Sequence, residues 1–292
     1  MAMRLSLPAA LSWQPQTIPV IARSSLTVGL IDAVIPVAGG AFMLAVNTAD
    51  TGSLSASPQR QDLNLFTNTN GGSPSFTAYG SGRFYSLASS QYSSRNSSPL
   101  KQLDECSALA IVRDTGAAAS GNPYFAYGLS GGGVNDRNLF MLGNQGPGNV
   151  QFRVRDSSNV DQTFNATGGL STNTNNIIIG TRSEVQNFVR CYSNGRLVGS
   201  TTATAMAATT FDRTAVCALL RNTAALYQTG VVSLCLAWDR ALQPAEAVAL
   251  SVNPWQVFDY PSRPIFLDTV AAAAAGFIGQ RPISRLMPHI LR

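Results

Sequence analysis

The stretch VQFRVR, Val150–Arg155, decides the fold class of this chain of 292 residues. Apolar and polar side chains alternate along it with a period of two, which is typical of a β-strand with one buried and one exposed face. Further along, Phe188–Tyr192 and Arg196–Val198 flank Ser193-Asn194-Gly195. Asn-Gly favours a tight β-hairpin because both residues tolerate a positive φ angle. These two patterns predict antiparallel β structure.

A second strand, Val231–Trp238, is apolar on both of its faces. This pattern predicts an inner strand that is covered on both sides. Shorter apolar runs between Gly-, Asn- and Ser-rich turns predict further strands. They are Phe42–Val46, Ser75–Tyr79, Arg83–Leu87, Ala108–Arg113, Tyr124–Leu129, Leu139–Leu142, Ile177–Ile179 and Val216–Leu220. Many short strands separated by turn residues indicate a β-sandwich or jelly roll.

One short helix is expected at Leu242–Leu250. Pro244 suits the first helical position, where its missing N–H costs no hydrogen bond. Glu246 lies in the first turn, where a negative charge favours the helix dipole. The pair Asn253-Pro254 then ends the helix.

Charged residues make up 12% of the chain, the net charge is +5 and the pI is about 9.3. A nucleic-acid-binding protein usually concentrates its basic residues on one face, whereas the arginines here are scattered singly and Lys101 is the only lysine. The apolar stretches are too short, or too often interrupted by Pro, Gly or Asp, to span a bilayer. The sequence therefore predicts neither a nucleic-acid partner nor a membrane partner.

No catalytic residue is predicted. The three glutamates, Glu105, Glu184 and Glu246, form no carboxylate pair of the kind that a glycosidase needs. His289, the only histidine, lies near the C-terminus; a His-based triad or zinc site would have to use it, and a surface or contact residue is the simpler interpretation. The four cysteines lack a CxxC spacing and lie in apolar runs, so free buried thiols are the simpler interpretation, although pairing stays open.

Three parts of the chain resemble a known family. The hairpin YSNGRLV, Tyr192–Val198, is similar to the "yvNGxxv" element of laminin-G and concanavalin A-like domains. The stretch GVVSLCLAWDRALQPAE, Gly230–Glu246, resembles their closing strand and the short helix that follows it, with Gln243 in place of the usual Ser or Thr cap. The ending LSVNPWQVF, Leu250–Phe258, resembles the "L…NPWqlF" ending of many tailed-bacteriophage and prophage proteins with this domain.

The resemblance implies an all-β fold: an antiparallel concanavalin A-like jelly-roll sandwich with one short C-terminal helix. It also leaves calcium open, because laminin-G domains often bind Ca²⁺ through oxygen atoms of loop residues. The loop residues with suitable side chains are Asp136, Asn138, Asp156 and Asp161. From the residues themselves we expect no cofactor.

We expect three parts: an N-terminal arm at residues 1–40, the sandwich at residues 41–260 and a C-terminal arm at residues 261–292. Both arms contain prolines that break helices, and both are rich in apolar side chains. A solvated linker would not have this composition, so each arm needs a surface to lie on, either its own domain or a neighbour. Candidate docking residues are Trp13, Ile18, Phe277, Ile278 and Leu286.

Two functional hypotheses follow, and both are non-enzymatic. In the first, the chain is a structural component of a tailed-phage virion, assembled in the host cytoplasm. Its arms then dock it to other virion proteins and to copies of itself. In the alternative, it is a carbohydrate-binding module that recognises a host-surface glycan, with Trp255 as the candidate for stacking on a sugar.

Overall fold

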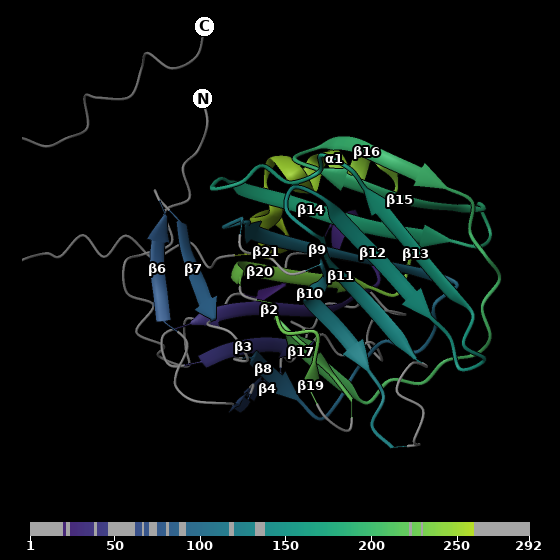
Figure 1. Ribbon diagram of the computed structural model, residues 1–292, viewed down its shortest axis with the longest axis horizontal. Coiled ribbons are helices and arrows are strands. Elements are labelled where there is room, and N and C mark those ends of the chain that lie inside the picture. The colour runs from purple at the N-terminus through teal and green to yellow at the C-terminus, as the bar shows by residue number, and fades with distance from the viewer. Residues whose placement is uncertain are drawn as a thin grey trace, which may run out of the picture. The chain divides into compact units, whose positions relative to one another are not determined.

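A computed structural model describes residues 20–21, 24–37, 40–45, 62–65, 67–69, 75–79, 82–87, 92–116, 120–131, 138–221, 224–228 and 230–259. Within these residues, two antiparallel sheets form the two layers of a sandwich (Figure 1). The predicted all-β sandwich is therefore confirmed.

The smaller sheet has seven strands in the order β13-β12-β11-β10-β17-β8-β5. All of the pairings in it are antiparallel. Its strands are β5 (Thr67–Thr69), β8 (Tyr92–Arg95), β10 (Ser120–Gly128), β11 (Leu139–Gln145), β12 (Val150–Arg155), β13 (Asp161–Ala166) and β17 (Arg213–Val216).

The larger sheet has ten strands, eight of them in the order β16-β15-β14-β9-β20-β2-β3-β4, and β7 joins β20 to β6. The strands before β9 are β2 (Leu30–Val37), β3 (Gly40–Ala45), β4 (Asp62–Leu65), β6 (Ser75–Tyr79) and β7 (Gly82–Leu87). The others are β9 (Glu105–Arg113), β14 (Asn175–Ser183), β15 (Phe188–Ser193), β16 (Arg196–Thr201) and β20 (Gly230–Trp238).

Short elements complete the described structure. Strand β1 (Val20–Ile21) pairs with β21 (Phe258–Asp259), and β18 (Leu219–Leu220) pairs with β19 (Ala224–Ala225). The helices are η2 (Ser25–Thr27), α1 (Pro244–Val252) and η4 (Pro254–Val257). None of the helices in this part of the chain is long and apolar enough to cross a membrane.

Local sequence signals place several elements correctly. Strand β12 occupies the predicted residues, and its apolar side chains, every second one along it, belong to the core. The β15–β16 hairpin turns at Asn194 and Gly195, whose φ angles are +49° and +81°. Helix α1 begins at Pro244, and the backbone N–H of Gln243 donates to the Glu246 carboxylate at 2.8 Å. Asn253 caps the end of α1, as predicted.

One predicted strand is wrong in part. Val216–Leu220 was expected to be continuous, but β17 ends at Val216 and β18 begins at Leu219. Cys217 between them has a φ angle of +61°, which turns the chain out of the sheet. The backbone N–H of Gln228 then donates to the carbonyl of Cys217 at 2.9 Å, so the segment 217–228 leaves and rejoins the sheet at one place.

Part of the predicted N-terminal arm belongs to the sandwich. Strand β2 pairs with β20 at the centre of the larger sheet, and Leu30, Ile31 and Val34 are almost completely buried. The sandwich therefore begins before the predicted boundary at residues 40 and 41, because these apolar side chains complete its core. The candidate docking residues Trp13, Ile18, Phe277, Ile278 and Leu286 lie outside the described residues, as does the C-terminal arm.

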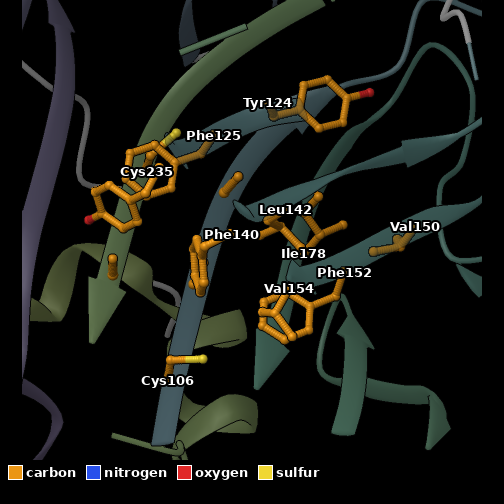
Figure 2. Close-up of a cluster of buried hydrophobic side chains, with 14 of the residues drawn as sticks. Cys106, Tyr124, Phe125, Phe140, Leu142, Val150, Phe152, Val154, Ile178 and Cys235 are labelled. Atoms are coloured by element: carbon orange, nitrogen blue, oxygen red, sulfur yellow. The ribbon is translucent and has the colours of Figure 1, made fainter. Parts of the chain in front are cut away.

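The main core fills the space between the two sheets (Figure 2). The smaller sheet contributes large aromatic side chains, and Phe140 meets Phe152 edge to face with ring centroids 5.6 Å apart. The larger sheet contributes smaller side chains, among them Cys106, Ile178 and Cys235. Large side chains on one sheet thus pack against small ones on the other, which brings the sheets close together.

The four cysteines are free thiols in the core: Cys106, Cys191, Cys217 and Cys235. Burial raises the pKa of the Cys106 thiol to about 12, and it raises the pKa of the other three as well. A thiol in this state is a poor nucleophile and behaves as a small apolar side chain. This agrees with the interpretation of the cysteines as buried hydrophobes.

A buried ion pair crosses the core from one sheet to the other. Asp32 on β2 is fully buried, and both of its carboxylate oxygens accept from Nη2 of Arg95 on β8, at 3.0 and 3.1 Å. The hydroxyl of Tyr127 on β10 also donates to Asp32. Nε of Arg95 donates to Oγ1 of Thr214 on β17 at 3.3 Å. Three strands of the smaller sheet are thereby tied to one strand of the larger sheet.

We expect Arg95→Met to lower the free energy of unfolding by about 3 kcal/mol, because it leaves the Asp32 carboxyl buried without its cationic partner. Urea denaturation measures this change. The control is the double variant Asp32→Asn, Arg95→Met, which removes both charges and should lose less stability than the single variant. Equal losses in the two variants would show that the ion pair has no specific role.

The pH dependence of stability tests the same pair. Burial raises the pKa of Asp32 from 3.8 to about 6, although the charge of Arg95 opposes the rise. The native state then holds the Asp32 proton more tightly than the unfolded state, so the contribution of Asp32 to stability is greatest below about pH 4 and falls as the pH rises through about 6. We expect wild type to gain stability relative to Asp32→Asn between about pH 7 and about pH 5 in urea titrations. Parallel curves would contradict this.

Candidate functional site

The outer face of the larger sheet is covered by the C-terminal segment over β9 and β14. Ser107 alternates along β9 with inward-facing Cys106 and Ala108, so it points outward. The backbone N–H of Leu242 donates to Oγ of Ser107 at 2.9 Å and to Oγ1 of Thr181 at 3.0 Å. Helix α1 then lies against β14 (Figure 1). This part of the face is therefore occupied by the chain itself.

The outer face of the smaller sheet is covered over β10 and β17. The outward residues there and on β11 are apolar, and Leu219 of β18 packs on Ala126 of β10 and on Leu139 and Met141 of β11. Gly128 is needed for this approach, because a Cβ at that position would clash with the carbonyl oxygen of Leu220. Strand β18 thus forms a cover over this part of the smaller sheet.

The other half of this outer face, on β12 and β13, carries polar side chains. Val150, Phe152 and Val154 of β12 point into the core, so the residues between them point outward. The outward residues of β13 lie directly opposite them in the β12–β13 register. We call this set the polar platform: Gln151, Arg153, Arg155, Asp161, Thr163 and Asn165.

An ionic cluster forms one end of the polar platform. Nε of Arg153 donates to both carboxylate oxygens of Asp161 at 3.1 Å, and Nε of Arg155 donates to one of them at 3.0 Å. The hydroxyl of Thr163 donates to the same carboxylate at 3.0 Å. Partial burial alone would raise the pKa of Asp161, but the hydrogen bonds from both arginines outweigh it and lower the pKa to about 2. Two guanidinium groups against one carboxylate leave a net positive charge.

A row of amides forms the other end. Gln151 is 3% exposed, and its Nε2 donates to Oε1 of Gln145 on β11 and to Oδ1 of Asn165 on β13, the latter at 2.9 Å. Its own Oε1 is buried and has no hydrogen-bond partner. A buried polar atom without a partner costs about 1–3 kcal/mol, so this arrangement needs a reason other than stability.

The polar platform is not among the sites that the sequence predicts. The only signal in the sequence was the polar half of the VQFRVR alternation, which any half-exposed strand would show. Asp161 was considered as a loop ligand for calcium, but it begins β13 and is engaged by two arginines. Which half of the sheet stays uncovered depends on the fold of segment 217–228, and that is a tertiary property.

Trp255 lies away from the polar platform. It is in η4, directly after α1, so it belongs to the C-terminal segment over the larger sheet. Its partly exposed ring packs on Phe258, with centroids 6.1 Å apart. Its backbone N–H donates to Oδ1 of Asn253 at 3.2 Å. These contacts agree with a packing role, and stacking on a sugar stays a prediction.

Asp156, one of the residues considered for calcium, is engaged by backbone donors, and its own carbonyl accepts from the backbone N–H of Asn138 at 3.2 Å. Asp156 accepts from the backbone N–H groups of Ser158 and Val160 at 2.8 Å and of Ala207 at 2.6 Å, so its carboxylate fastens two loops together. Asp136 lies outside the described residues. Within the described ranges, no three His, Cys, Asp or Glu side chains gather in a way that could hold a metal ion.

The three glutamates make structural contacts. Glu246 forms an ion pair with Arg240 at 2.7 Å, and Glu184 forms one with the buried Arg182 at 2.5 Å. Glu105 accepts hydrogen bonds from the hydroxyl of Ser183 and the backbone N–H of Ala241. Each carboxylate therefore stabilises a different junction. His289 is outside the described residues.

Comparison with solved structures supports the fold. The CBM40 of the Ruminococcus gnavus IT-sialidase, bound to α2,3-sialyllactose, has a TM-score of 0.50 and is 14% identical, over 57% of this chain and 96% of that chain. Domain 4 of AbnA, a GH43 extracellular arabinanase from Geobacillus stearothermophilus in complex with arabinotriose, has a TM-score of 0.49 and is 15% identical, over 64% and 88%. The NanB sialidase of Streptococcus pneumoniae has a TM-score of 0.47 and is 15% identical, over 56% and 27%.

These similarities concern the fold. No protein-family model matches the sequence, and no curated protein matches it either. The chain therefore has the β-sandwich fold found in carbohydrate-binding modules, and this agrees with the general class that the sequence analysis predicted. The first of these structures is covered almost completely, whereas about a quarter of the NanB sialidase is covered.

The cover over the smaller sheet can be tested at Gly128. We expect Gly128→Ala to lower the free energy of unfolding by about 1–3 kcal/mol, because the added methyl group pushes against the backbone of Leu220. The control is Gly146→Ala, where the space around the new Cβ is open and only the φ angle of +79° is unfavourable. Its cost should be about 1 kcal/mol. Thermal unfolding of both variants gives the comparison, and a smaller loss at Gly128 would contradict the proposed cover.

Proposed function

We propose that this chain is a non-enzymatic glycan-binding module and that the polar platform is its binding surface. The observation that carries the proposal is the outer face of β12 and β13, where arginine, carboxylate, hydroxyl and amide groups lie side by side and Asp161, Thr163 and Asn165 are exposed. Sugars present hydroxyl groups and ring oxygens, which need both donors and acceptors fixed on a rigid surface. Strands β12 and β13 supply that rigidity.

The fold supports the proposal. The CBM40 of the R. gnavus sialidase has a similar sandwich and is described with a bound sialylated sugar. Proteins with one fold often differ in function, so the argument for this chain rests on the side chains of its own platform.

A virion role is the second candidate, and it rests on the phage-like ending at Leu250–Phe258. In the structure these residues form the end of α1, η4 and the start of β21. The two candidates are compatible, because a displayed sandwich can bind a glycan. Docking to virion proteins or to other copies through the arms, and location in a virion, stay predictions.

The proposal is tested by glycan-array screening of the full chain, followed by calorimetry with the best glycan. We expect Thr163→Val combined with Asn165→Ala to weaken binding at least about tenfold, because both side chains are exposed polar groups of the platform. The matched control combines Thr201→Val with Asn175→Ala, which makes the same changes at exposed positions of the larger sheet. Its affinity should equal that of wild type.

Two results would overturn the proposal. If wild type binds no glycan, the function is wrong. If the platform variant binds as wild type does while Trp255→Ala abolishes binding without loss of fold, then the sugar stacks on the C-terminal segment and the platform is the wrong surface.

A further inference from the structure

The side-chain amides of Gln145, Gln151 and Asn165 form a row across β11, β12 and β13. In this row the donor and acceptor of each hydrogen bond are fixed. Gln151 stands between Gln145 and Asn165, and its one amide nitrogen donates to the side-chain oxygen of each neighbour. A primary amide has two hydrogens on nitrogen, so this nitrogen uses both of them. The oxygen and the nitrogen occupy opposite arms of the planar amide group. Because Oδ1 of Asn165 turns toward Gln151, Nδ2 of Asn165 turns away from it.

The opposite orientation of the Gln151 amide would leave more buried hydrogen-bonding groups without partners. If Gln151 were rotated, its oxygen would accept from both neighbours and its two N–H groups would take the buried position that Oε1 now occupies. The present direction leaves one buried acceptor unmatched, and the other would leave two buried donors unmatched. Buried donors without partners are rarer in native proteins than buried carbonyl oxygens without partners. Burial of Gln151 therefore fixes the direction of the row.

We propose that Gln151 is a positioning residue that makes the platform present N–H donors outward, so that the platform selects glycans with an anionic oxygen group. This inference rests on the proposed function. The side-chain nitrogen of Asn165 supplies the outward donor, and the guanidinium groups of Arg153 and Arg155 supply more donors and the net positive charge. A carboxylate or a sulfate on the sugar offers only acceptors, which matches this surface.

Two variants test the inference. Gln151→Met keeps the length and the charge but removes both hydrogen-bond donations, so the direction of the Asn165 amide is no longer fixed. Asn165→Asp lies on the surface, keeps an oxygen toward Gln151 and replaces the outward N–H donors with an oxygen. The matched control is Asn175→Asp, which adds the same charge on the larger sheet. Thermal unfolding shows whether each variant is folded.

The measurement is calorimetric affinity for three probes on one sugar backbone: a uronic acid, a sulfated sugar and the uncharged sugar. For wild type we expect affinities for the two acidic probes at least about tenfold above that for the uncharged one. Gln151→Met and Asn165→Asp should reduce this ratio about tenfold, and Asn175→Asp should keep it. The ratio separates positioning from stability, because loss of folded protein lowers all three affinities together.

Each outcome decides a different claim. If wild type binds none of the probes and no array glycan, the proposed function fails. If wild type binds acidic and uncharged sugars equally, or if Asn165→Asp keeps the wild-type ratio, the inference fails while the proposed function stands. If Gln151→Met does not fold, Asn165→Asp alone decides the question, because its side chain is exposed.

Discussion

Strand β20 is buried on both faces, and this constraint organises the rest of the structure. Leu234, Leu236 and Trp238 alternate with Cys235 and Ala237, and all five are fully buried. A sheet whose central strand is apolar on both sides needs one cover made by the second sheet and another made by additional chain. The second cover comes from segments far apart in sequence: Nε1 of Trp238 donates to the carbonyl of Leu26 at 2.8 Å, and the segment after β20 folds back over β9 and β14.

The same requirement explains why the smaller sheet has two unlike halves. Strand β11 is buried on both faces, whereas β12 and β13 alternate between buried and polar positions. The cover formed by β18 lies over the apolar part of this face. The outward side chains of the polar part bond to one another through the Arg–Asp cluster and the amide row, although Oε1 of Gln151 has no partner. The polar part is thus the part of this sheet where an external ligand can meet ordered polar groups.

Features encoded within a few residues could be predicted, and features that join distant segments could not. The alternation at Val150–Arg155, the turn at Asn194-Gly195 and the start of α1 at Pro244 are local, and the structure confirms all three. The Asp32–Arg95 pair joins residues 63 positions apart, and neither residue lies in a pattern that reveals the other. The polar platform was missed for a different reason, because exposed alternation looks alike whether or not a ligand binds.

Three local irregularities occur on the outer face of the smaller sheet. Cys217 and Leu226, at φ angles of +61° and +53°, bracket the turn of the cover, and a left-handed conformation costs about 1–2 kcal/mol for a residue with a side chain. Gln151 adds a buried oxygen without a partner. A chain selected for stability alone would tend to remove such costs, and in native proteins they concentrate where function requires them. Cys217 and Leu226 determine how the chain folds at the cover. Gln151 determines which groups of the amide row donate and which accept. All three irregularities thus lie on the face of the smaller sheet that carries the proposed binding surface.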